Sequence, residues 1–185
     1  MSSCLPVVKM HYGIKQPKNE TSHSIFEYLV DHYYPLCSQY IFKDSASFFE
    51  MYKEHKKTVL TTIIVDKNYK MIAPDTTKCQ WSGGYFVRRL KTDTIYATDS
   101  SLDVRSLLSK IISTADSTSV NFAKDDFDFL VINTWGKFLG KYNERLFATS
   151  EEVKKRKDLR IKVINLNLDM QKSWNIQKGD QLRFN

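Results

Sequence analysis

The stretch FDFLVINTW, from Phe127 to Trp135, constrains the fold of this chain more than any other part of the sequence. It is almost continuously apolar and rich in β-branched and aromatic residues, which is typical of a β-strand. A strand with one face in water would alternate polar and apolar residues, whereas a continuous apolar run is typical of a sheet covered on both faces. This stretch therefore predicts a central strand with helices on both sides of the sheet.

Other stretches predict the elements around that strand. Dense β-branched or aromatic residues, or their alternation with polar ones, predict strands over 58–65, 70–73, 84–91, 94–98 and 159–168. Helical spacing of apolar residues and capping patterns predict helices over 22–37, where Pro35 marks the stop, and over 44–57, 99–114 and 149–157. Strands precede and follow the helix over 99–114. The expected fold class is therefore α/β, with α+β as the alternative, in a mixed central sheet flanked by helices.

Length and composition favour one domain. The chain has 185 residues, of which 42 % are hydrophobic and 13 % aromatic, and this is enough apolar material for one core. Only six glycines and four prolines occur, so no long linker is expected. We expect a single domain over 1–185, with a helical N-terminal part over 1–57 and a core that contains the sheet over 58–185.

The charge of the chain suits a polyanionic partner. Lys and Arg total 28 against 21 Asp and Glu, which gives a net charge of +7. Binding to nucleic acid phosphates releases counterions and favours such a protein, although a soluble basic protein without that role has the same composition. Cys4, Cys37 and Cys79 form no Cys-x-x-Cys pair, so no zinc site is expected. We expect a soluble intracellular protein of the cytoplasm or nucleus, with no membrane partner.

Pro74-Asp75 and the order of elements from Thr58 to Leu168 carry a family resemblance. A strand meander, a helix and then a buried strand resemble the core of the PD-(D/E)XK, or restriction-endonuclease-like, nuclease superfamily. The resemblance implies a nucleic-acid substrate and, in an active enzyme, two carboxylates and a lysine that converge on Mg²⁺. Mg²⁺ is therefore expected as a cofactor only if the chain is catalytic.

The catalytic motif of that family is incomplete in this sequence. Asp66 and Asp75 are the candidate metal-binding carboxylates, with Lys78 or Lys91 as the basic partner. No acidic-x-Lys follows at a suitable distance, because Arg89 stands two residues before Lys91, where an anion would be needed. Asp75 has an alternative role as a turn residue, which is common for Pro-Asp-Thr-Thr.

Two segments are candidates for nucleic-acid contact. In KCQWSGGYFVRRLK, Trp81 and Tyr85 are placed to stack on bases, while Arg88 and Arg89 are placed to meet phosphates. The alternative is an ordinary edge strand whose cations point into water. The second candidate is the basic run Lys154, Lys155, Arg156 and Lys157, for which the alternative is a solvated helix face.

The sequence thus predicts a nucleic-acid-binding protein with a restriction-endonuclease-like core, which is either a metal-dependent nuclease or a degenerate one. Whether it is an enzyme, whether it binds DNA or RNA, and whether it forms a homodimer stay open. The alternative is a non-enzymatic intracellular protein that docks on an acidic protein partner. Small accessory proteins of viruses and mobile elements have this size and this lack of motifs.

Overall fold

The computed structural model describes residues 10–55, 62–73, 83–123 and 126–176. At its centre, β7 (Phe129–Trp135) and β8 (Ile161–Asn167) run parallel in continuous register. Every residue of β7 is buried, which confirms the predicted central strand. Parallel neighbours need a long crossover connection, and α6 (Tyr142–Lys155) lies in it.

In the described part of the chain, seven strands form one mixed sheet in the order β5-β4-β3-β7-β8-β2-β6. The strands outside the central pair are β3 (Thr62–Asp66), β4 (Met71–Ile72), β5 (Thr98–Asp99), β2 (Gln39–Phe42) and β6 (Ile111–Ser113). β2 is parallel to β8, whereas β3, β4, β5 and β6 each pair antiparallel with their inner neighbour. The sheet and its helices confirm the predicted α/β class.

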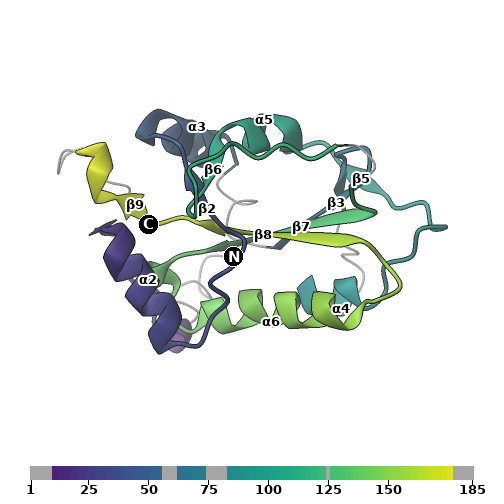
Figure 1. The fold of residues 1–185 in the computed structure, drawn as a ribbon, viewed down its shortest axis with the longest axis horizontal. Coiled ribbons are helices and arrows are strands. Elements are labelled where there is room, and N and C mark those ends of the chain that lie inside the picture. The colour runs from purple at the N-terminus through teal and green to yellow at the C-terminus, as the bar shows by residue number, and fades with distance from the viewer. Residues whose placement is uncertain (1–9, 56–61, 74–82, 124–125, 177–185) are drawn as a thin grey trace, which may run out of the picture.

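Helices cover both faces of this sheet. α6 and the short helix α4 (Gly83–Val87) lie below it in Figure 1, and α3 (Ser45–His55) and α5 (Val104–Ser109) lie above it. α2 (Ser22–Asp31) lies at the end of the molecule opposite α4 (Figure 1).

Alternate residues of β3 reach different parts of the core, as the pleat of a strand requires. Ile63 and Val65 belong to the large cluster that also contains Leu107 of α5, while Ile64 belongs to a smaller cluster with Val87 of α4. The sheet therefore has a packed apolar layer on each face.

Two strands that the sequence did not predict complete the sheet. β2 lies between β8 and β6, so the N-terminal part of the chain is not only helical. The helix predicted over 99–114 ends early, because α5 stops at Ser109 and Ile111 pairs with Phe42 of β2. Ile111 is fully buried in this strand. The apolar residues whose spacing predicted a longer helix are thus buried by a helix followed by a strand.

Short polar side chains cap the starts of three helices. Thr21 and Ser24 form the capping box of α2, with both backbone-to-side-chain bonds at 3.1 Å. Asp44 accepts a hydrogen bond from the Ser47 amide at the start of α3. Asp103 caps α5 through the Ser106 amide.

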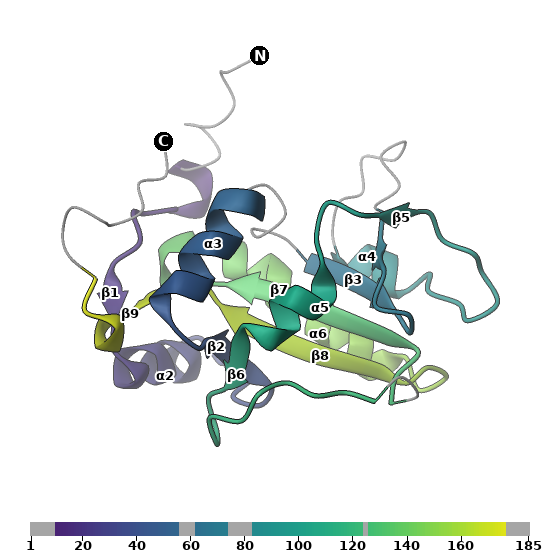
Figure 2. The same ribbon diagram turned by 90° about the horizontal axis from the view of Figure 1, so that it is seen from above.

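The N-terminal part of the described chain contacts the segments that follow β7 and β8. β1 (Asn19–Glu20) pairs in parallel with β9 (Met170–Gln171), beside the 3₁₀ turn η2 (Lys172–Trp174), as Figure 2 shows. The Lys15 amide donates to the carbonyl of Phe138 in the 3₁₀ turn η1 (Lys137–Leu139) at 2.7 Å. The N-terminal segment is thereby fixed to the connection between β7 and α6.

Among the helices of the described ranges, none is both long and apolar enough to cross a membrane.

Candidate functional site

The segment predicted as an aromatic and basic strand is a helix. Residues 84–91 were expected to be extended, but Gly83–Val87 form α4, and backbone bonds from Arg89 to Phe86 and from Leu90 to Val87 continue as turns. Gly83 and Gly84 are the first two residues of this helix. A Cβ on Gly83 would come within 2.7 Å of the Thr62 side chain, and one on Gly84 within 3.1 Å of Glu152 Cγ. Glycine lets the start of α4 approach β3 and α6 closely.

Arg156 links the end of α6 to α4 through hydrogen bonds. Its guanidinium donates to the carbonyls of Val87 at 2.6 Å and Leu90 at 2.7 Å, and it forms a two-bond pair with Asp158 at 2.8 and 2.7 Å. Hydrogen bonding to Arg156 lowers the pKa of Asp158 to about 2. Arg156 is therefore turned into the structure, although the sequence grouped it with cations that face a ligand.

The cations of both predicted segments meet around this junction. The exposed residues Arg88, Arg89, Lys91, Lys155 and Lys157 form what we call the basic face. Arg88 lies 3.7 Å from Glu152, and Lys155 lies 2.7 Å from the same carboxylate. One mostly covered acid therefore offsets part of the charge, and hydrogen bonding to Lys155 lowers the pKa of Glu152.

Tyr85 lies within the basic face as an aromatic platform. The guanidinium of Arg89 lies 4.3 Å from the centre of its ring, and that of Arg88 lies 5.9 Å from it. Both distances are in the range of cation–π contacts. An arginine plane stacked on an aromatic ring is a surface on which a nucleobase can also stack.

Lys154 belongs to another side of α6. Hydrogen bonding to Glu151, at 2.7 Å, raises the pKa of Lys154, and Cys37 makes a smaller contribution in the same direction. The four cations of the predicted run thus have different positions. Arg156 is turned inward, Lys154 lies on another side of α6, and Lys155 and Lys157 belong to the basic face.

Asp66 has a structural role at the turn between β3 and β4. Its Oδ1 accepts hydrogen bonds from the amides of Asn68 at 2.8 Å and Lys70 at 2.9 Å. The other predicted site residues, Asp75, Lys78 and Trp81, lie outside the described residues. Within residues 10–55, 62–73, 83–123 and 126–176, no three His, Cys, Asp or Glu side chains are grouped so that they could hold a metal ion. Because Asp75 is outside these ranges, the Mg²⁺ site predicted at Asp66 and Asp75 stays a prediction.

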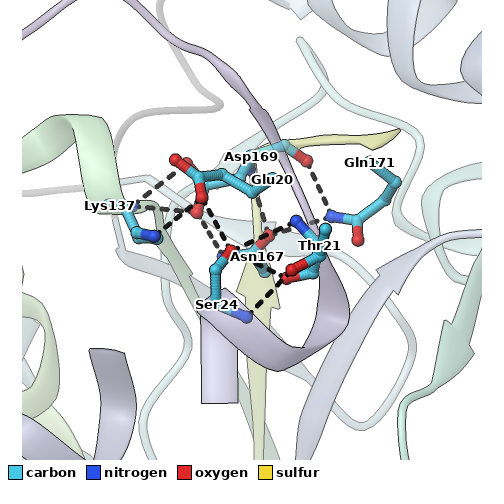
Figure 3. A network of polar contacts seen from close by, with 7 residues as sticks. All are labelled: Glu20, Thr21, Ser24, Lys137, Asn167, Asp169 and Gln171. Carbon is cyan, nitrogen blue, oxygen red and sulfur yellow. Dashed lines mark hydrogen bonds and ion pairs between the residues drawn. The ribbon is translucent and has the colours of Figure 1, made fainter. Parts of the chain in front are cut away.

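A second polar cluster, which the sequence did not predict as a site, lies where β7 and β8 end (Figure 3). Asp169 is 1 % exposed, and its carboxylate accepts from the Lys137 amide at 3.1 and 2.9 Å and from the Asn167 side chain at 2.8 Å. The ammonium of Lys137 instead pairs with Glu20 at 2.7 Å. Two acids and one lysine thus meet at the edge where the parallel strands terminate.

Burial governs the electrostatics of this cluster. Desolvation raises the pKa of Asp169 to about 6, and the nearby Glu20 adds to the rise, while the bonds from Lys137 and Asn167 oppose it. A carboxylic acid with such a pKa can exchange a proton near neutral pH. Glu20 Oε2 also accepts from Ser24 Oγ at 2.7 Å, so the N-terminal segment supplies part of the cluster.

The sequence signal nearest to this cluster was the alternation LRIKVINLNL over 159–168, which predicted a strand but ended before Asp169. The polar residues at alternate positions are Asn165, Asn167, Asp169 and Gln171, and each is 1 to 3 % exposed. Asn167 bonds to Asp169 and Gln171, while Asn165 accepts a hydrogen bond from Asn133 of β7. This polar row is buried because its side chains find hydrogen-bond partners inside the fold.

The β7–α6–β8 unit lacks the residues for thiol chemistry at the start of its helix. Cys-x-x-Cys beside a βαβ pattern is typical of thioredoxin-like redox proteins, and helix N-termini lower thiol pKa values. The connection here reads GKFLGKY, from Gly136 to Tyr142, and contains no cysteine. Disulfide exchange at that position is therefore excluded.

These features define the class as a single α/β domain built on a mixed sheet, with a basic face at the α4–α6 junction and a buried acid cluster at the other end. No protein-family model, curated protein or solved structure matches the chain.

Proposed function

We propose that this protein binds nucleic acid and that the basic face contacts phosphates. One observation carries this proposal: two basic segments that are distant in sequence lie side by side, joined where Arg156 bonds to Val87 across 69 residues of chain. Each segment alone is a short run of surface cations. Together they place Arg88, Arg89 and Lys91 next to Lys155 and Lys157 on one junction.

Counterion release supplies the physical reason for binding. Each phosphate that is neutralised releases condensed ions, so affinity grows with the number of cations in reach of the backbone. Tyr85 and Arg89 add a stacking surface that unpaired bases can use. A location in the cytoplasm or nucleus belongs to this proposal, because nucleic acid is found there.

The observations support binding more than cleavage. Asp66, the described member of the predicted carboxylate pair, already accepts two backbone amides that close a hairpin. We therefore assign no catalytic step to it. Cleavage would be tested by adding Mg²⁺ to single- and double-stranded substrates and comparing wild type with Asp66→Asn and Asp75→Asn.

Binding is tested by fluorescence anisotropy with labelled single- and double-stranded DNA and RNA, between about 50 and about 200 mM salt. We expect affinity to fall steeply with salt, with a slope of log K against log salt of roughly −2 to −4 if the basic face meets a few phosphates. Arg89→Gln, Lys155→Gln and Lys157→Gln should each weaken binding and reduce the slope by about 1.

Lys172→Gln is the matched control, because it removes the same charge from the segment after β9, at the end of the molecule opposite α4 (Figure 1). We expect it to leave binding nearly unchanged. An equal loss in Lys172→Gln would mean that net charge alone drives binding. No binding at low salt would refute the proposal, and preferential binding to polyglutamate would favour the rival expectation of an acidic protein partner.

A further inference from the structure

Large apolar side chains are exposed together on α2 and the turn that follows it. Among the described residues, the exposed large apolar side chains are Met10, Phe26, Val30, Tyr33, Leu36 and Ile95. Four of these six fall between Phe26 and Leu36, with exposures of 53, 45, 96 and 51 % in chain order. We call these four residues the α2 patch. Single exposed apolar residues are ordinary, but a contiguous group of them marks an interaction surface.

The patch is separate from the face by which α2 joins the core. Ile25 and Leu29 are buried against the rest of the molecule. Phe26 and Val30 each follow one of them by one position, which corresponds to a rotation of about 100° around the helix. α2 therefore has apolar residues on a second side of the helix, beyond the side that packs on the core.

Tyr33 is a second and independent observation. It has a φ of 56° at the end of α2, where its amide bonds to Val30 and the amide of Tyr34 bonds to Leu29. These two bonds are those of a Schellman motif, in which the left-handed position is usually glycine. Here a bulky tyrosine occupies the strained position and projects into solvent. Strain of this kind that is kept in a fold is a pointer to function.

The surroundings of the patch are acidic. No lysine or arginine occurs between Lys18 and Lys43, in a chain that has 28 of them. Glu27 and Asp31 are exposed and follow Phe26 and Val30 directly. Glu27 lies 3.1 Å from the exposed His23.

We propose that the α2 patch docks a basic amphipathic segment of another protein. The apolar side of such a segment would pack on Phe26, Val30 and Tyr33, and its Lys or Arg side chains would meet Glu27 and Asp31. Phe26 and Val30 are one helical turn apart on α2, and Tyr33 projects from the turn just beyond its end. An amphipathic helix can lay its apolar face on such a surface. The proposal is independent of nucleic-acid binding at the basic face.

The test uses two labelled helical peptides of the same length, one built from Leu and Lys and one from Leu and Glu. Anisotropy with the whole protein should show binding of the Lys peptide and not of the Glu peptide. Tyr33→Gly is the most informative variant, because glycine relieves the positive φ and should maintain or raise the melting temperature. We expect it to weaken the Lys peptide about tenfold or more, and loss of binding without loss of stability cannot be attributed to unfolding.

Two further variants complete the test. Glu27→Gln combined with Asp31→Asn should weaken binding of the Lys peptide and reduce its salt dependence. Ile95→Ser, which alters an exposed apolar residue elsewhere in the chain, should have no effect. Three outcomes would overturn the proposal: no binding of the Lys peptide, equal binding of both peptides, or a wild-type dimer in ultracentrifugation that Tyr33→Gly makes monomeric. The last outcome would identify a second copy of this chain as the occupant.

Discussion

At the scale of single residues, the buried carboxylate of Asp169 links stability to pH. Its pKa is about 6 in the folded protein, whereas an exposed aspartate in the unfolded chain has a pKa of about 3.9. The folded state therefore holds the proton more tightly than the unfolded state. The stability from this residue is fully present below about pH 4 and is lost as the pH rises to about 6.

Asp169→Asn should remove this dependence, because an amide does not titrate. We expect the wild type to lose on the order of 1–3 kcal/mol of unfolding free energy between about pH 4 and 6 through this residue, and the variant to lose less. Urea unfolding at several pH values in this window measures the difference in slope.

Asp158→Asn is the control for that experiment. The pKa of Asp158 is lowered to about 2 by Arg156, so its contribution is lost only as the pH falls below about 4. Its removal should leave the slope between pH 4 and 6 as in wild type. An unchanged slope in Asp169→Asn would show that this carboxylate titrates normally.

The residue scale is also where sequence reasoning was weakest. The alternation of residues 159–168 was sufficient to predict a strand, but not to show that Asn165 and Asn167 are buried. That outcome depends on hydrogen-bond partners far away in sequence. The side chain of Asn133 donates to Asn165, and the amide of Lys137 donates to the neighbouring Asp169, only after the sheet has formed.

At the scale of elements, α4 is held in part by Arg156, the residue that follows α6. α4 has five residues, which is too short to be stable alone in water. Arg156 donates hydrogen bonds to the carbonyl of Val87, the last residue of α4, and to that of Leu90, three residues later. The Arg156 side chain is only 15 % exposed. Its planar fork reaches both carbonyls and Asp158 together, which a lysine ammonium cannot do.

Arg156→Ala should therefore cost about 2–3 kcal/mol, because the hydrogen bonds from a charged group to the Val87 and Leu90 carbonyls are lost, and the Val87 carbonyl keeps only the bond from the Leu90 amide. Arg156→Lys should recover only part of that loss. Lys157→Ala, at the exposed neighbour, should stay within about 0.5 kcal/mol of wild type. Guanidinium unfolding curves compare the three, and an effect of equal size in Lys157→Ala would count against this role of Arg156.

The same junction explains why a strand was predicted over 84–91. Tyr85, Phe86 and Val87 have high strand propensity, but propensity is a weak prior that tertiary contacts override. Here Gly83 and Gly84 permit close packing on Thr62 and α6, and Arg156 binds the carbonyls that follow. The sequence alone identified the residues of the basic face as candidates for contact with nucleic acid. Only the structure showed that the two segments lie next to each other.

At the scale of the whole molecule, the N-terminal part belongs to the sheet. β2 is hydrogen-bonded to β8 on one side and β6 on the other, so it cannot leave without dividing the sheet. Circular dichroism and tryptophan fluorescence should therefore report one coincident unfolding transition, as expected for a small two-state domain. Separate transitions, with helical signal lost before fluorescence, would show that residues 22–55 unfold independently.

The central strand, the fold class and the covering of both sheet faces could be predicted at this scale from the apolar run at Phe129–Trp135. The strand order could not. β2 is only four residues long, and its place depends on partners far away in sequence, such as Asn165 for Gln39 and Ser113 for Tyr40. Local patterns carry no record of such pairings.

The pairing of the chain's two ends has a consequence for protein synthesis. Gln39 is a partner of Asn165, and Asn19 is a partner of Met170. A chain that emerges from the ribosome N-terminus first therefore holds β1 and β2 without their parallel partners until Asn165 and Met170 have also been synthesised. During that interval the unpaired strand edges are exposed to pairing with other chains. Nascent-chain chaperones that shield β1 and β2 until β8 and β9 emerge would therefore favour correct folding.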